Sequence, residues 1–333
     1  MALSNLQILA LKSFSGIGNK SIFKVADNFV DFPSDIEVVS LISKLGLKKK
    51  DSDGQKVLIT SDDFTHALVK AQKVISDSAS LGINVVSYFD KAFPQSLRET
   101  KSENGKRVDA PPLLFYKGDL SILKMPSVAI IGTRDCSPSA RKAGLFLAKS
   151  FAQRGFSIVS GLAIGCDTAA HEGALAAKNG KTIAFLAHGL DTIYPKQNLA
   201  LAEDILQQGG LLLSEYEIGT EVSRFSLVAR DRLQAGLANA TLVIQTGVDG
   251  GTMHAACATA NANKPLYVVK FSDHETNSLP NTEGNHLLVK DYGAMYLAAS
   301  PDRVKFEKEL DEIGEKIRNS QLLKEADSEP TLL

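Results

Sequence analysis

Four short segments rich in glycine, serine and threonine follow apolar runs in the middle of the chain. They are Gly132-Thr133-Arg134, Ser160-Gly161 with the nearby Gly165, Gly189, and Gly247 with Gly250-Gly251-Thr252. Small residues at the end of a strand allow close approach to the backbone, and the amino end of the following helix adds N–H donors and partial positive charge. One such turn is weak evidence, because tight turns need glycine in any case. Four of them at one sheet edge predict a site for a phosphate-bearing ligand.

Arg134 is the strongest single candidate for a ligand contact. A guanidinium directly after a strand can hold a phosphate through two hydrogen bonds, whereas the alternative is a surface ion pair with Asp135. The first strand is not followed by the GxGxxG pattern of dinucleotide-binding folds, and the GxxxxGK[ST] pattern of ATP hydrolases is also missing. We therefore expect no cofactor and no ATP hydrolysis.

A second group of arginines lies in residues 224–232. The candidate ligand-binding side chains there are Arg224, Phe225, Arg230 and Arg232. Positive charge for phosphates beside an aromatic ring for base stacking suits a single-stranded nucleic acid. Arg230 and Arg232 cannot share one helix face, so one of them could pair with Glu215 or Asp231 while the other faces the ligand. The same residues could also form an ordinary ion-paired surface.

Two titratable residues on the helix after the second turn could take part in acid–base chemistry. Asp167 and His171 are four residues apart, which places them on one helix face. No nucleophile or metal-ligand partner is recognisable near them, so we expect His171 to be a hydrogen-bonded structural residue at the rim of the site. His188 and His254 match no metal-binding spacing. These residues predict neither catalysis nor a metal site.

Strand-like apolar runs alternate with helical segments from residue 127 onward. The runs cover residues 128–131, 156–159, 182–186, 211–215, 241–246 and 265–270. Helical crossovers between such runs cover both faces of a sheet, which predicts an α/β, Rossmann-like, doubly wound and mostly parallel sheet over residues 127–298. Such a sheet binds its ligand at the carboxyl ends of the strands, where the glycine-rich turns would meet. Residues 272–286 are polar and are expected to be turn-rich.

The first part of the chain is expected to form smaller units. Residues 1–80 have a helical pattern in which Gly16 and Gly18 lie in a turn between two helices. These glycines either present backbone N–H groups to a phosphate, as in a helix-hairpin-helix, or only close the turn. The run Lys48–Lys50 is expected in a solvated loop, and residues 81–126 form a connector packed on the main domain.

The last part of the chain, residues 299–333, is expected to form a charged helix followed by a tail. Ser300-Pro301 is typical of an N-cap and a first helical position, and the helix is expected to end near Arg318. The tail from Asn319 is expected to be frayed.

The composition is that of an ordinary globular protein. Hydrophobic residues make up 44% and charged residues 23%, no apolar stretch approaches the length of a membrane span, and the first residues lack the features of a secretory signal. We therefore expect a cytoplasmic protein that does not contact membranes. The formal net charge of −1 gives no global attraction to a polyanion, so a nucleic acid would bind through a local patch. The cysteines, Cys136, Cys166 and Cys257, form no CxxC pair and are expected to be reduced thiols.

The order of these motifs resembles that of the DNA-processing protein A family, also called DprA or Smf. The matching segments are residues 128–134 (VAIIGTR), 158–171 (IVSGLAIGCDTAAH), 182–195 (TIAFLAHGLDTIYP), 212–216 (LLSEY), 230–237 (RDRLQAGL) and 250–252 (GGT). The resemblance extends over residues 85–292, and it is specific because the motifs occur together in one order.

The resemblance implies a non-enzymatic recombination mediator with a small SAM-like helical domain before its Rossmann-like domain. Members of the family bind single-stranded DNA, usually as homodimers, and help to load the RecA recombinase onto it, notably during natural transformation. Gly132, Thr133 and Arg134 would then contact phosphate, and Arg230 and Arg232 would lie in the adjoining basic pocket.

The chain departs from the family pattern in three places. The usual arginine-asparagine-arginine is Arg230-Asp231-Arg232 here, which places an acid in the pocket motif, and Phe225-Ser226 stands at a different offset from the usual phenylalanine-proline. Few residues follow the Rossmann-like region, so we expect the carboxyl-terminal winged-helix domain of many members to be absent. The chain therefore resembles a divergent branch of the family.

Two other functions are compatible with the expected fold. A sensor would bind a free nucleotide in the same pocket, without an extended basic groove. A nucleoside-monophosphate phosphoribohydrolase of the related lysine-decarboxylase-like group would need a glutamate shortly after its glycine-rich turn, but Thr252 is followed by Met253, His254, Ala255 and Ala256. We therefore expect binding rather than catalysis.

Overall fold

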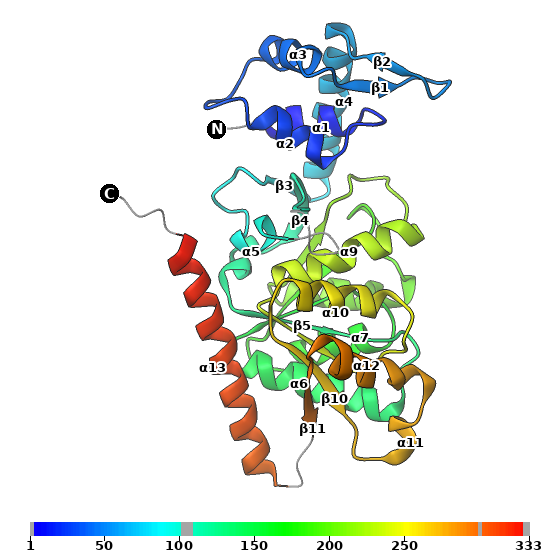
Figure 1. Cartoon of the computed structure of the whole chain (residues 1–333), viewed down its shortest axis with the longest axis vertical. Coiled ribbons are helices and arrows are strands. Elements are labelled where there is room, and N and C mark those ends of the chain that lie inside the picture. The colour runs from blue at the N-terminus through cyan, green and yellow to red at the C-terminus, as the bar shows by residue number, and fades with distance from the viewer. Residues whose placement is uncertain (1–2, 101–108, 299–301, 329–333) are drawn as a thin grey trace.

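The computed structural model describes residues 3–100, 109–298 and 302–328. Its centre is a nine-stranded sheet with the strand order β11-β10-β9-β5-β6-β7-β8-β4-β3 (Figure 1). The parallel strands are β5 (Ser127–Ile131), β6 (Ser157–Ser160), β7 (Lys181–Leu186), β8 (Leu211–Ser214), β9 (Ala240–Val243), β10 (Leu266–Lys270) and β11 (Met295–Ala298). Beyond β8 the sheet continues with the antiparallel strands β4 (Leu113–Gly118) and β3 (Asn84–Ser87).

The strand order confirms the predicted doubly wound, Rossmann-like fold. From the central strand β5 the chain adds β6, β7 and β8 on one side, and it then crosses to β9 and continues outward through β10 and β11. The strands β5 to β10 overlap the six predicted apolar runs. Strand β11 was not predicted, although its residues Met-Tyr-Leu-Ala are all apolar, and only Leu297 of this strand is buried.

Helices cover both faces of the sheet. One face packs against α6 (Pro138–Gln153), α7 (Cys166–Leu175), α8 (Leu199–Gln207) and α13 (Arg303–Ser328), and the other against α9 (Arg224–Leu237), α10 (Gly251–Asn261) and α12 (Glu283–Tyr292). Successive side chains of a strand point to opposite faces, so Val128 and Ile130 join the core under α6, whereas Ala129 and Ile131 join the cores on the other side. Burial on both faces explains why these strands read as continuous apolar runs.

Local sequence signals fix the starts of the two helices nearest the carboxyl ends of the central strands. At α9, Ser223 Oγ accepts the N–H of Ser226 at 3.0 Å and Ser226 Oγ accepts the N–H of Ser223 at 2.8 Å, which forms a reciprocal cap. At α7, the residue before the helix is Gly165 with φ +82°, a conformation that residues with a side chain rarely adopt.

The amino-terminal unit contains four helices, as the predicted helical pattern indicates, and a small hairpin. Its elements are α1 (Asn5–Lys12), α2 (Asn19–Ala26), α3 (Asp35–Lys44), β1 (Lys48–Lys50), β2 (Lys56–Leu58) and α4 (Ser61–Ser80). The expectation of a solvated loop at Lys48–Lys50 is wrong. These residues form strand β1, which pairs with β2 in antiparallel orientation. The strand is held by backbone bonds, including one from Lys50 N to Ser15 O at 2.8 Å, and its lysines gave no apolar pattern from which it could be predicted.

The turn between α1 and α2 packs on this hairpin. Gly16 has φ +95°, and a Cβ added to it would lie 3.6 Å from Lys48 O, whereas Gly18 has open space around its Cα and precedes α2. The first glycine therefore closes a tight turn against β1, and the second leaves the amino end of α2 uncovered.

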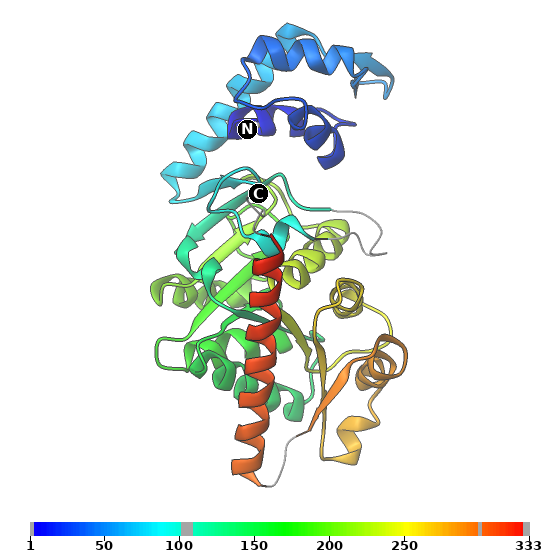
Figure 2. The ribbon, with the colours of Figure 1, turned by 60° about the vertical axis from the view of Figure 1, so that its left-hand side comes forward.

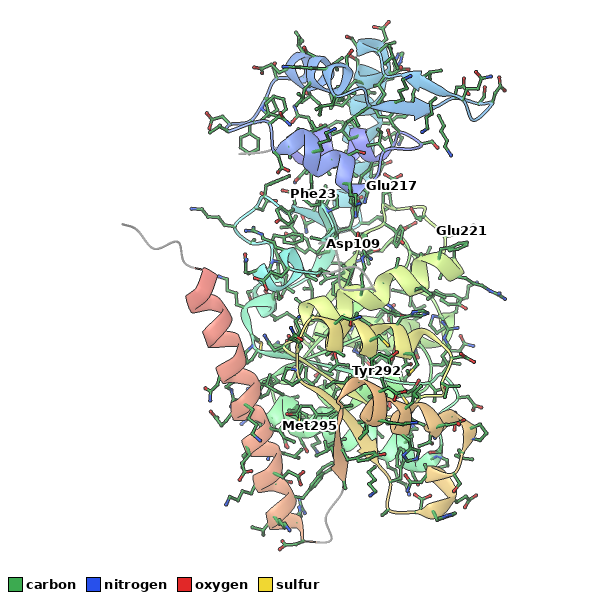
Figure 3. The ribbon with its side chains drawn as sticks, viewed as in Figure 1. Phe23, Asp109, Glu217, Glu221, Tyr292 and Met295 are labelled. Carbon is green, nitrogen blue, oxygen red and sulfur yellow. The ribbon has the colours of Figure 1, made fainter. Side chains whose placement is uncertain are left out.

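The amino-terminal unit sits on the β3–β4 end of the sheet. Phe23 of α2 contacts Tyr88, with ring centroids 4.8 Å apart, and Figure 3 shows Phe23 at the level where the two parts meet. Lys12 Nζ donates a hydrogen bond to Glu215 O at 2.9 Å, and burial lowers the pKa of Lys12. Leu11 and Phe115 belong to one buried cluster that runs from the helices into the sheet. The two parts therefore share a continuous core.

The segment expected as a connector takes part in the main sheet. Residues 81–126 supply β3 and β4 and the short helices α5 (Gln95–Arg98) and η1 (Leu120–Lys124). The expectation that residues 272–286 are turn-rich is wrong in part. This segment contains α11 (His274–Asn277), η3 (Pro280–Thr282) and the start of α12. Its polar residues serve inside the protein, since the buried Asn285 bonds Ile244 O at 2.9 Å and Val269 O at 3.0 Å.

The last helix, α13, runs along the sheet and reaches Ser328, so the expected end near Arg318 is too early (Figure 2). The expected cap at Ser300-Pro301 lies outside the described residues. Phe306, Leu310 and Ile317 of α13 are buried with Phe156 in one apolar cluster. In the described part of the chain, no helix combines the length and the apolar character that crossing a bilayer requires.

The packing of α13 gives a stability prediction. Leu310→Ala is expected to lower the free energy of unfolding by about 2–5 kcal/mol, because it leaves a cavity beside the sheet at a fully buried position. The control is Val304→Ala on the same helix, where the side chain is 81% exposed and a change below about 0.5 kcal/mol is expected. Urea denaturation measures both variants, and equal losses would contradict the packing of α13.

Candidate functional site

A cavity of about 460 Å³ lies at the carboxyl ends of β5 and β9. These neighbouring strands are the point from which the chain winds to opposite sides of the sheet, and the crevice outside such a point is where doubly wound folds bind ligands. The lining comes from the loop after β5, the first turns of α9, the segment after β9 and the start of α10. Segments far apart in the sequence thus form one site.

Most of the predicted site residues line this cavity. They are Gly132, Thr133, Arg134, Asp167, Arg224, Arg230, Gly250, Gly251 and Thr252. Gly161 lines a neighbouring groove, Ser160 is fully buried with its Oγ bonded to Ile130 O at 2.7 Å, and Gly165 lies behind the Arg134 loop. The expected gathering of the glycine-rich turns at one sheet edge therefore agrees with the structure.

The glycines of these turns have two different roles. A Cβ on Gly132 would lie 2.5 Å from Cys166 Sγ, and one on Gly165 would collide with the carbonyl oxygens of Thr133 and Arg134. These two glycines let the β5 loop pack against the start of α7. Gly250 differs, because a Cβ there would meet no atom within 4 Å. The amino end of α10 therefore lies at the cavity, next to the Asp231 carboxylate, whose Oδ2 would lie 2.8 Å from a Cβ on Gly251.

Arg134 is an exposed cation at the rim of the cavity. It lines both the cavity and the neighbouring groove, and among the described residues it forms no ion pair, so the alternative pair with Asp135 is absent there. The loop that carries it is fixed, because Thr133 N donates to Gln245 O at 2.7 Å and Cys166 N donates to Thr133 O at 3.1 Å. A loop fixed by backbone hydrogen bonds thus presents an exposed charged side chain.

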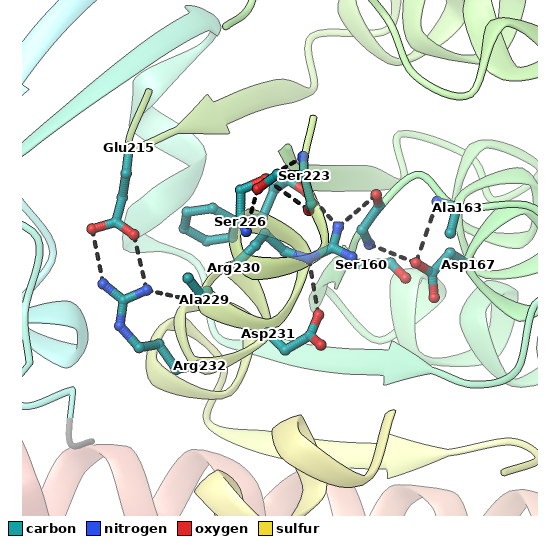
Figure 4. Close-up of polar contacts among 12 residues, drawn as sticks. Ser160, Ala163, Asp167, Glu215, Ser223, Ser226, Ala229, Arg230, Asp231 and Arg232 are labelled. Carbon is teal, nitrogen blue, oxygen red and sulfur yellow. Dashed lines mark hydrogen bonds and ion pairs between the residues drawn. The ribbon is translucent and has the colours of Figure 1, made fainter. Parts of the chain in front are cut away.

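Arg230 is a buried cation in the floor of the site (Figure 4). Its Nη1 donates to Gly161 O at 2.7 Å and Phe185 O at 2.8 Å, and its Nε donates to Asp231 Oδ1 at 3.0 Å. The side chain therefore fixes α9 against the ends of β6 and β7, while its remaining surface lines the cavity. The role of Arg230 is mainly to position the walls and to supply positive potential.

Arg232 does not belong to the site, which corrects the expectation that it lies beside Arg230 in a basic pocket. It points to the opposite side of α9, where it pairs with Glu215 at 2.8 Å and Asp109 at 2.9 Å (Figure 4). Two residues of a helix that are two positions apart face different directions, and Glu215 at the end of β8 captures the one on its side. This is the ion-paired arrangement that the sequence left open.

Two carboxylates lie next to the buried guanidinium. Asp167 Oδ2 accepts the N–H groups of Gly161 at 3.2 Å and Ala163 at 3.3 Å, and burial raises the pKa of this carboxyl. Burial also raises the pKa of Asp231 to about 6, against the opposing effect of Arg230. No group of three or more metal-ligating side chains occurs among residues 3–100, 109–298 and 302–328.

His171 is not at the rim, contrary to expectation. It is fully buried, and its Nδ1 lies 2.7 Å from Thr182 Oγ1. Because that hydroxyl donates its own proton to Ile158 O at 2.7 Å, Nδ1 must carry the proton of the imidazole. Burial lowers the pKa of His171 to about 3, so the ring is neutral and structural. The helical spacing predicted which face of α7 carries His171, but it did not predict that the residue is fully buried.

A groove that the sequence did not reveal continues from the cavity. It has a volume of about 710 Å³ and shares Arg134, Ala163, Leu227 and Arg230 with the cavity. Tyr194, which is 45% exposed, and Lys196 form its far end. The signal that could have indicated it is the aromatic–proline–lysine sequence after β7, which puts a ring next to a charge.

Phe225 lines neither the cavity nor the groove. It lies in the first turn of α9 with 89% of its side chain exposed, beside Arg224. A separate cavity of about 520 Å³ lies near the amino ends of β5 and β10, where Phe93 and Lys124 are among its lining residues, and the predicted site residues all lie elsewhere. The exposed Arg134 therefore lies at both the cavity and the groove, and the exposed ring of Tyr194 lies in the groove.

Comparisons with known proteins identify the family of the chain. Residues 84–307 match the family model of DNA recombination-mediator protein A. The chain is 31% identical over 302 residues to the DNA processing protein DprA of Streptococcus pneumoniae, which covers 91% of this chain and 98% of that protein. It is 31% identical to DprA of Bacillus subtilis, with 66% of this chain and 71% of that protein covered. With protein Smf of Escherichia coli the match spans 59% of this chain and half of that protein.

Solved structures give the same result. The X-ray structure of Streptococcus pneumoniae DprA superposes with a TM-score of 0.70 at 29% identity, over 89% of this chain and 95% of that one. DprA of Helicobacter pylori, a protein described for its single-stranded DNA binding mode, superposes with a TM-score of 0.57 at 30% identity, over 69% of this chain and 96% of that one. By sequence and by fold, the chain belongs to the DNA recombination-mediator protein A family.

Proposed function

We propose that the protein binds single-stranded DNA along the cavity and the groove that meet at Arg134. The observation that carries this proposal is the exposed Arg134, which has no ion pair among the described residues and lines both the cavity at the amino end of α10 and the groove that contains Tyr194 and Lys196. Phosphates would lie at the cation and the helix end, and bases would stack on Phe225 and Tyr194. The relative from Helicobacter pylori supports the same ligand class.

Family membership supports a wider role for the same surface. We propose that the protein acts as a DNA-processing recombination mediator in the cytoplasm, as a homodimer that delivers the strand to RecA recombinase, with natural transformation as the setting. This role needs binding rather than catalysis. Both carboxylates of the site are held by hydrogen bonds, Asp167 by two backbone N–H groups and Asp231 by Arg230.

The alternative function is a nucleotide sensor. The cavity of about 460 Å³ is by itself large enough for one nucleotide, since small-molecule sites span roughly 300–1,000 Å³. The groove distinguishes the two functions, because a free nucleotide does not need it and a strand does.

A direct titration separates these functions. We expect a labelled single-stranded oligonucleotide to bind more tightly than the same sequence as a duplex, and its affinity to fall steeply with salt, because phosphate contacts release counterions. A mononucleotide should compete weakly. Retention of a mononucleotide with equal or absent binding of both DNA forms would contradict the strand proposal and support the sensor.

Arg134 is expected to be the main phosphate contact. Arg134→Ala should weaken strand binding about 10-fold or more, because a charge-assisted hydrogen bond contributes about 1.5–3 kcal/mol, and it should reduce the salt slope by about 0.7 for one lost phosphate contact. Fluorescence anisotropy at several salt concentrations measures both quantities.

Arg141→Ala is the matched control, because Arg141 is paired with Glu172 at 2.7 Å and lies outside the cavity and the groove. The thermal transition of each variant shows whether it is folded. If Arg134→Ala binds as tightly as Arg141→Ala, Arg134 does not contact the DNA.

Asp231 should make strand binding depend on pH. Its pKa is raised to about 6, so the carboxylate is charged above this pH and repels a phosphate, and it becomes neutral as the pH falls through 6. We therefore expect affinity to increase as the pH falls from about 7.5 to about 5.5. Asp231→Asn should bind more tightly at the higher pH and lose this dependence.

The raised pKa has a matching effect on stability. The folded protein holds this proton more tightly than the unfolded chain does, so the contribution of Asp231 to stability falls as the pH rises from 3.8 to about 6. Denaturation of the wild type and of Asp231→Asn over this range measures the difference. If the two proteins have the same pH profiles for binding and stability, Asp231 does not face the ligand site.

A further inference from the structure

Two of the cysteines lie against each other behind the Arg134 loop. Cys136 follows Arg134 by two positions, and Cys166 is the first residue of α7. Cys166 belongs to an apolar cluster against which Cys136 packs, and each thiol shifts the pKa of the other. Both are free thiols. The spacing in the sequence gave no sign of this pair.

The backbone holds these two thiols together. Cys166 N donates to Thr133 O at 3.1 Å on one side, and Ser137 N donates to Gln245 Oε1 at 2.8 Å on the other. Asn281 Nδ2 also donates to Asp135 O at 2.7 Å. Because the residues on both sides of Cys136 are fixed in this way, its thiol stays next to Cys166. This closeness gives a reaction between the two sulfurs a high effective concentration.

The two thiols differ in exposure and acidity. Cys136 is half-buried, whereas Cys166 is fully buried. The hydrogen bond from Cys166 lowers the pKa of Cys136 to about 7, and the hydrogen bond to Cys136 together with burial raises the pKa of Cys166. Thiolates rather than thiols attack oxidants, so Cys136 is the group that reacts first. Cys166 is then in position to complete a disulfide.

We propose that Cys136 and Cys166 form a redox modification site, in which a peroxide converts the two thiols into a disulfide that pulls the Arg134 loop toward α7. The Cys136 sulfur attacks one peroxide oxygen, the O–O bond breaks, and hydroxide leaves as Cys136 becomes a sulfenic acid. The Cys166 sulfur then attacks the Cys136 sulfur, the S–O bond breaks, and water leaves. The sulfurs together lose two electrons, which the peroxide gains. A dithiol reductant returns the electrons and protons.

The disulfide weakens the binding of DNA phosphates. A covalent sulfur–sulfur bond is shorter than a contact between two thiols, so its formation draws Cys136 toward the start of α7 and strains the hydrogen bonds that fix the Arg134 loop in the reduced protein. Arg134, two residues away, then shifts relative to the amino end of α10. This consequence rests on the proposed function, whereas the formation of the disulfide does not.

Peptide mapping tests the formation of the disulfide. The full chain is treated with hydrogen peroxide, its remaining thiols are blocked with N-ethylmaleimide under denaturing conditions, and the unreduced digest is examined by mass spectrometry. A cross-linked peptide pair containing Cys136 and Cys166 is expected from the wild type and from Cys257→Ser, but not from Cys136→Ser. If peroxide has oxidised Cys257 but N-ethylmaleimide still alkylates both Cys136 and Cys166, the proposal is overturned.

Binding of a labelled oligonucleotide by the same samples tests the effect on the loop. The oxidised wild type should bind the oligonucleotide at least about 5-fold more weakly than the reduced wild type. Dithiothreitol should restore the affinity. The affinity of Cys136→Ser should not change with peroxide. A complete cross-link with unchanged affinity would overturn the movement of the loop. Failure of the reduced protein to bind DNA would contradict the proposed function instead, and the cross-link result would stand.

Discussion

The groove depends on one buried guanidinium. Arg230 reaches from α9 to the carbonyl oxygens of Gly161 and Phe185, and thereby joins the ends of β6 and β7 to the helix that forms the wall of the cavity. A buried charge is tolerated only when hydrogen bonds and a counter-charge replace its water, and here two carbonyls and Asp231 do so. Gly161 makes the arrangement possible, because a Cβ there would occupy the place of the guanidinium. The geometry of the whole edge follows from this contact.

Arg230 and Arg134 have different roles in the site. Arg230 is fixed by its ion pair with Asp231 at 3.0 Å, so it mainly positions the helix that lines the cavity. Arg134 is exposed at the rim and has no counter-ion among the described residues, so its charge is available to a ligand. Because burial raises the pKa of Asp231 to about 6, the positive potential at the floor is expected to increase as the pH falls through this value. A protein with a net charge of −1 can in this way present a local anion site.

The sequence predicted the centre of the fold well, because strands buried on both faces read as apolar runs and glycines follow them. It also predicted that the turns meet at one edge. The prediction failed where backbone contacts or the degree of burial decide the structure. Strand β1 consists of lysines that are held by backbone hydrogen bonds. His171 lies on the predicted helix face, but it is fully buried. Helix periodicity predicted that Arg230 and Arg232 face different directions. Only the position of Glu215 in the structure shows that Arg232 is the one that forms an ion pair away from the site. The contact of Cys136 with Cys166 depends on the path of the β5 loop, which no spacing rule describes.

The central claim is that single-stranded DNA lies along the cavity and groove at the carboxyl ends of the central strands. Photo-crosslinking of an oligonucleotide with a halogenated pyrimidine at each position in turn, followed by mass-spectrometric mapping, locates the bases directly. We predict cross-links to the exposed ring of Tyr194, which lines the groove together with Arg134, and to the exposed ring of Phe225 in the first turn of α9. Cross-links confined to the turn at Gly16 and Gly18, or to Phe93 at the opposite end of the sheet, would contradict it.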